Sequence, residues 1–135
     1  SSEVVSDDPQ SPVKENLNVT INGIHNARWS YRLPKICSEN FLTNSKIPYV
    51  ICRYFNVYGP GEEHKNNMSS VAYQMFIKNK LGKEIQLFPG NPKRDFIYVD
   101  DVVSANLFAF ENFKKLSGKF YDVGYGIAES FEKIF

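Results

Sequence analysis

A tyrosine and a lysine four residues apart, Tyr31 and Lys35, have the spacing of a pair that could take a proton from an alcohol. Residues i and i+4 of a helix lie one turn apart on the same face. An ammonium group held beside a phenol favours the phenolate, which is the form that acts as a general base. Chance supplies such a pair in many chains, so the neighbouring segments decide its meaning.

A helix must hold this pair in place. We expect a helix that begins between Ser30 and Pro34 and ends near Asn44. A proline removes one helix hydrogen bond unless it lies in the first turn. Tyr31 is therefore expected at, or just before, the first residue of the helix, which weakens the one-turn geometry of the pair without abolishing it.

The rest of the chain alternates between strands and helices. The apolar run 49–54 predicts a strand buried on both faces of a parallel sheet. Helices are expected over 69–80, stopped by Gly82, and over about 101–113, with the apolar stripe Val103, Leu107 and Phe110. Further strands are expected at 85–88, 96–99 and 120–123. This order predicts an α/β fold, the C-terminal part of a Rossmann-like doubly wound parallel sheet with part of a small substrate-binding lobe.

Composition narrows the class of protein. A net charge of +1 over 135 residues gives no reason to expect nucleic acid or an anionic membrane as partner. No apolar run approaches the roughly 20 residues that span a bilayer. Cys37 and Cys52 lack the spacing of a metal site, so no metal is expected and both are interpreted as buried free thiols of a reducing, cytoplasmic compartment.

Four segments in order give the Tyr31–Lys35 pair its meaning. They are Ser1-Ser2-Glu3-Val4-Val5, Tyr31-Arg32-Leu33-Pro34-Lys35, Arg53-Tyr54-Phe55-Asn56-Val57-Tyr58-Gly59-Pro60 and the run from Lys93 to Val102. Together they resemble the extended short-chain dehydrogenase/reductase family of NAD-dependent nucleotide-sugar epimerases and dehydratases. The resemblance runs nearly end to end, and it implies transient oxidation of a sugar carbon with NAD, or NADP, as cofactor.

The resemblance also implies residue roles. Tyr31 would be the base, Lys35 would bind the cofactor ribose, and Ser1, with Ser2 as an alternative, would bind the reacting hydroxyl. Tyr31, Val57 and Lys65 would also lie at the cofactor. A nucleotide-diphosphate sugar would be the partner, with Arg94 on its diphosphate; the residues that would contact it are Asn56, Asn67, Gln74, Phe88, Asn91 and Arg94.

Residues 61–74 resemble, within that family, the ADP-glycero-manno-heptose 6-epimerases. There the lysine at the position of Lys65 is a second base opposite the tyrosine, as inversion at a carbon requires. Before residue 50 the chain looks more like nucleotide-sugar decarboxylases and 4,6-dehydratases, and a related reductase stays open as well. A different reading is a truncated, non-catalytic protein that binds no cofactor.

No G-x-x-G-x-x-G loop occurs in the sequence. We therefore expect residues 1–135 to be a single fragment, the catalytic and substrate-binding half of such an enzyme, with the dinucleotide-binding half missing. A severed sheet exposes strand edges and apolar side chains, which also predicts a homo-oligomer.

Overall fold

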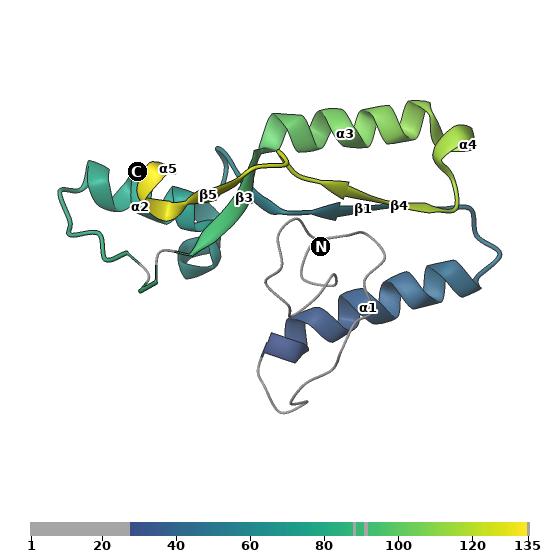
Figure 1. Ribbon diagram of the computed structural model, residues 1–135, viewed down its shortest axis with the longest axis horizontal. Helices are drawn as coiled ribbons and strands as arrows, with labels where there is room; N and C mark the ends of the chain where they lie inside the picture. The colour runs from purple at the N-terminus through teal and green to yellow at the C-terminus, as the bar shows by residue number, and fades with distance from the viewer. Residues whose placement is uncertain (1–27, 88, 91, 135) are drawn as a thin grey trace. The chain divides into compact units, whose positions relative to one another are not determined.

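The computed structural model describes residues 28–87, 89–90 and 92–134 (Figure 1). The chain divides into two compact units, which are described separately. The first unit runs to Arg53 and includes Phe108–Asp122. The second unit contains Tyr54–Leu107 and Val123–Phe135. Of the residues with predicted roles, Ser1, Phe88 and Asn91 lie outside the described residues.

The first unit is built on helix α1 (Arg28–Asn44) and the strand β1 (Val50–Tyr54). Strand β1 pairs with β4 (Lys119–Val123) in a two-stranded sheet, and the short helix α4 (Phe113–Leu116) precedes β4. The amide of Gly118 donates to the carbonyl of Tyr49 at 2.7 Å, which aligns the ends of the two strands. Burial of β1 on both faces is not seen, because Ile51 alone of its residues is buried within the described chain.

Helix α1 corrects the expectation for Pro34. The helix begins at Arg28, so Pro34 lies inside it and Tyr31 is a residue of the helix proper. A proline at this position removes one backbone donor, and its ring crowds the carbonyl four residues before it. The hydroxyl of Ser38 donates to the carbonyl of Pro34 at 2.8 Å. The one-turn relation between Tyr31 and Lys35 is therefore intact.

The second unit centres on a three-stranded sheet with the order β2-β3-β5. Strand β2 (Asn56–Tyr58) runs parallel to β3 (Lys93–Tyr98), and β5 (Ala128–Ser130) runs antiparallel along the other edge of β3 (Figure 1). Helix α3 (Val99–Glu111) follows β3 directly, and α5 (Phe131–Ile134) follows β5. The ring centroids of Phe96 and Phe131 are 5.4 Å apart, edge to face. Among the described residues of this unit, the buried apolar side chains are Met75, Ile97, Val102 and Phe131.

A short 3₁₀ segment, η2 (Glu63–Met68), leads from β2 to helix α2 (Val71–Lys80). Ser70 caps α2, since its hydroxyl accepts a hydrogen bond from the amide of Tyr73 at 3.2 Å. Gly82 adopts φ +62° just beyond the last turn, the left-handed conformation that commonly ends a helix. The predicted helix and its stop are confirmed.

The α/β class and the parallel strand pair agree with the sequence expectations, whereas several local predictions are wrong. Residues 85–87 form no strand, and Cys37 is exposed rather than buried. The predicted stripe on α3 is exposed in this structure, and Val102 is the buried residue of that helix. None of the described helices is long and apolar enough to cross a membrane.

Candidate functional site

The Tyr31–Lys35 pair lies on the accessible side of α1. The ammonium nitrogen of Lys35 is 5.6 Å from the centroid of the Tyr31 ring. Tyr31 is 57% exposed, so the phenol is accessible to a ligand. The pair therefore presents a phenolic oxygen and an ammonium donor to the same region, which suits a base that works on an alcohol.

Helix α1 is fastened to β1 one turn beyond this pair. The guanidinium of Arg53 forms a bidentate ion pair with Glu39, with Nη2–Oε2 at 2.7 Å and Nε–Oε1 at 3.1 Å. The guanidinium also lies 4.6 Å from the centroid of the Phe120 ring on β4. Since Glu39 follows Lys35 at i+4, this contact fixes the rotation of the helix that carries the pair.

Asn56 opens β2 in the second unit, and its amide group is already oriented. Its Nδ2 donates to the carbonyl of Asp95 on β3 at 3.0 Å. The carboxylate of Asp95 in turn accepts from the amides of Tyr125 and Gly126, both at 2.7 Å. A strand–loop cluster thus holds Asn56, with Val57 next to it on the same strand.

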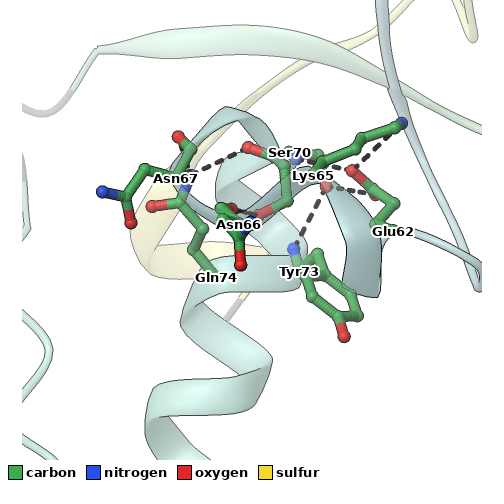
Figure 2. Close-up of polar contacts among 8 residues, drawn as sticks. Glu62, Lys65, Asn66, Asn67, Ser70, Tyr73 and Gln74 are labelled. Atoms are coloured by element: carbon green, nitrogen blue, oxygen red, sulfur yellow. Dashed lines mark hydrogen bonds and ion pairs between the residues drawn. The ribbon is translucent and has the colours of Figure 1, made fainter.

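Lys65 lies on the segment between β2 and α2, beside a buried carboxylate (Figure 2). Its ammonium is 3.6 Å from Oε2 of Glu62, and the Lys65 side chain is 46% exposed. Glu62 accepts hydrogen bonds from the amide and the hydroxyl of Ser70 at 2.6 and 2.7 Å. Burial alone would raise the pKa of Glu62, but these hydrogen bonds and the charge of Lys65 outweigh it and hold that pKa below its usual range.

The same segment holds Asn67 and Gln74. The side-chain amide of Gln74, on α2, donates from Nε2 to the carbonyls of Ser69 at 2.8 Å and of Asn67 at 3.2 Å. These two hydrogen bonds hold the segment against α2. Between Lys65 and Asn67, Asn66 has φ +48° and ψ −124°, a conformation that a residue with a side chain rarely adopts. The side chain of Asn67 itself is exposed.

Arg94 lies on the exposed first half of β3. Its Nη1 donates to the carbonyl of Lys93 at 2.8 Å. The planar fork of arginine suits a diphosphate.

The structure brings together Tyr31 and Lys35 on α1, and it brings Gln74 to Asn67 on the segment that also carries Lys65. Asn56, Val57 and Arg94 lie on the strands β2 and β3 of the second unit, and within the described chain no contact joins them to Lys65. Sequence reasoning missed Glu62, whose carboxylate contacts Lys65, and Asp95, whose main-chain carbonyl accepts from Asn56. Within the described parts of the chain, no group of three or more His, Cys, Asp or Glu residues is arranged to hold a metal ion.

Comparison with known proteins gives consistent matches. Residues 1–124 match the NAD-dependent epimerase/dehydratase family. An ADP-L-glycero-D-manno-heptose-6-epimerase of Brachyspira hyodysenteriae is 50% identical over 104 residues, which are 76% of this chain and 31% of the relative.

Solved structures agree. An ADP-L-glycero-D-manno-heptose-6-epimerase of Helicobacter pylori superposes with a TM-score of 0.78 at 32% identity, covering 97% of this chain and 40% of that one. A UDP-glucose 4-epimerase of Thermotoga maritima, solved with UDP-glucose, gives 0.62 at 29% identity, covering 74% of this chain and 31% of that one. The chain thus spans between about a third and two fifths of the length of these relatives.

Proposed function

The chain belongs to the NAD-dependent epimerase/dehydratase family. We propose that it supplies the general base Tyr31 with its neighbour Lys35, and the sugar-binding segments, of a nucleotide-sugar epimerase. The observation that carries the proposal is the Tyr31–Lys35 pair, one turn apart on α1 and accessible to a ligand. Tyr31 takes the hydroxyl proton of the sugar, and the ammonium of Lys35 lies beside its ring.

NAD fits this pair in part. The accessible ammonium of Lys35 suits a ribose hydroxyl as hydrogen-bond acceptor. When bound, NAD supplies the oxidation of the sugar carbon and its later reduction. The 135 residues contain no glycine-rich loop for the pyrophosphate, so that part of the cofactor needs residues outside this sequence. On this reading, residues 1–135 form the catalytic and substrate-binding half of the enzyme.

The substrate we propose is an ADP-glycero-manno-heptose. Support comes from the 50% identity to a heptose 6-epimerase and from the partly exposed ammonium of Lys65, to which we assign the second proton transfer. Arg94 binds the diphosphate and Asn56 helps to hold the sugar nucleotide. Ser1, Phe88 and Asn91 complete the proposed set. A decarboxylase or dehydratase, which the chain before residue 50 resembles, is the alternative activity within this family, and a cytoplasmic homo-oligomer stays a prediction.

The direct test uses the full-length protein with NAD and ADP-L-glycero-D-manno-heptose, or its 6-epimer, as substrate. Proton NMR follows interconversion of the two epimers, with UDP-glucose as the comparison substrate. Interconversion of the heptose pair without turnover of UDP-glucose supports the proposal. Turnover of UDP-glucose alone would contradict the heptose assignment while leaving the epimerase class in place.

A further inference from the structure

Residues 62–70 form a loop whose two ends are tied together while its tip is open to solvent. Glu62, at one end, accepts two hydrogen bonds from Ser70, at the other end (Figure 2). Glu62 is 5% exposed, whereas Met68 at the tip is 85% exposed. A buried carboxylate with several donors holds its neighbours firmly, because charge-assisted hydrogen bonds are short and strong.

Lys65 is the one cation that this carboxylate contacts in the described chain. The ammonium lies 3.6 Å from Oε2 of Glu62, the same oxygen that accepts from the amide of Ser70. The ion pair occupies one side of the ammonium, and the exposed remainder is open to a ligand. The contact also joins Lys65 to the start of α2, because the hydroxyl of Ser70 both donates to Glu62 and caps that helix.

The backbone next to Lys65 is strained. Asn66 has φ +48° with ψ −124°, and its carbonyl accepts from the hydroxyl of Ser69 at 2.7 Å. Strain of this kind persists only where the surroundings enforce it, and it recurs at ligand-binding segments. The clamp between Glu62 and Ser70 spans this residue and supplies such an enforcement.

We propose that Glu62 is a positioning residue of the epimerase reaction, whose buried carboxylate sets the place of the Lys65 ammonium relative to the sugar. This rests on the proposed function, in which Lys65 is the second proton-transfer group. Misplacement of a reacting group by about 1 Å can cost about a hundredfold in rate. Loss of the Glu62 charge should therefore lower kcat by about tenfold to a hundredfold, with a small change in KM.

A double-mutant cycle in the full-length enzyme separates positioning from general support of the fold. The variants are Glu62→Gln, Lys65→Met and the double variant, with Glu63→Gln as the control, because Glu63 is an exposed neighbour that loses the same charge. If Glu62 acts through Lys65, Glu62→Gln lowers kcat in the wild-type background and leaves the residual rate of Lys65→Met unchanged. Thermal denaturation of every variant reports any loss of stability separately.

Equal fold-losses from Glu62→Gln in both backgrounds would overturn the proposal and make Glu62 a scaffold residue. Wild-type kcat in Lys65→Met would also overturn it, and would show that the failure lies in the role proposed for Lys65. If Glu62→Gln does not fold, Glu62→Asp keeps the charge on a shorter side chain and is measured in the same cycle, with the same two criteria.

Discussion

The ion pair between Arg53 and Glu39 should be the strongest polar support of the helix that carries Tyr31 and Lys35. Its two hydrogen bonds are 2.7 and 3.1 Å long, and the two side chains are only 11% and 15% exposed. Replacing Arg53 with methionine keeps a long apolar side chain and removes the charge. Glu39 is then left largely buried without that partner.

The cost follows from this burial. Removing one partner of a fully buried ion pair costs about 3–5 kcal/mol, and an exposed pair is worth at most about 1 kcal/mol. Because this pair keeps some solvent contact, we expect Arg53→Met to lower the free energy of unfolding by about 2–3 kcal/mol. Part of that loss is the contact of the guanidinium with the Phe120 ring.

The chain contains a matched control. Lys133 and Glu129 form an ion pair of 2.6 Å, but the lysine side chain is 68% exposed. Lys133→Met should therefore cost less than about 1 kcal/mol. Urea denaturation of the full-length variants measures both changes through the midpoint at constant slope. Equal losses in the two variants would refute the claim that burial makes the Arg53–Glu39 pair the stronger support.

Two further predictions concern the carboxylates of Glu62 and Asp95. The pKa of Glu62 is lowered in the folded state. Its contribution to stability is therefore present above its ordinary pKa of 4.5 and is lost as the pH falls through the lower folded-state value. Urea denaturation at a series of pH values should show this loss in the wild type and not in Glu62→Gln. A Cβ on Gly124 would lie 2.6 Å from Oδ2 of Asp95. Gly124→Ala should therefore displace that carboxylate from the amides of Tyr125 and Gly126 and lower the free energy of unfolding by about 1–3 kcal/mol in the same assay. An unchanged midpoint would contradict the tight packing.

The sequence predicted the one-turn relation between Tyr31 and Lys35 well because helix periodicity depends only on spacing. Tyr31 and Lys35 are one turn apart in the structure, and the error concerned Pro34, which was expected in the first turn and lies inside the helix. Longer periodic elements such as α2 were also recognised. The strands β2 and β5 were missed, because three residues are too few for an alternating pattern to appear.

The supporting contacts could not be predicted in the same way. Glu62 and Glu63 are adjacent and of the same type, yet one is buried against Ser70 and the other is exposed. That difference depends on the path of the loop and on the unusual backbone of Asn66, which no local pattern signals. The wrong prediction for the apolar stripe on α3 has a similar cause. The helical period identifies which residues share a face, but not whether another element packs against that face.

The measurement that tests the central claim most directly is turnover of the heptose substrate by full-length Tyr31→Phe, with Tyr125→Phe as the control. Tyr125 is an exposed tyrosine in the loop after β4 and loses the same hydroxyl. General base catalysis contributes about 10²–10⁴-fold. Tyr31→Phe should therefore lower kcat at least about a hundredfold with little change in KM, while Tyr125→Phe keeps the wild-type rate. A Tyr31→Phe enzyme with wild-type kcat would show that this tyrosine is not the base.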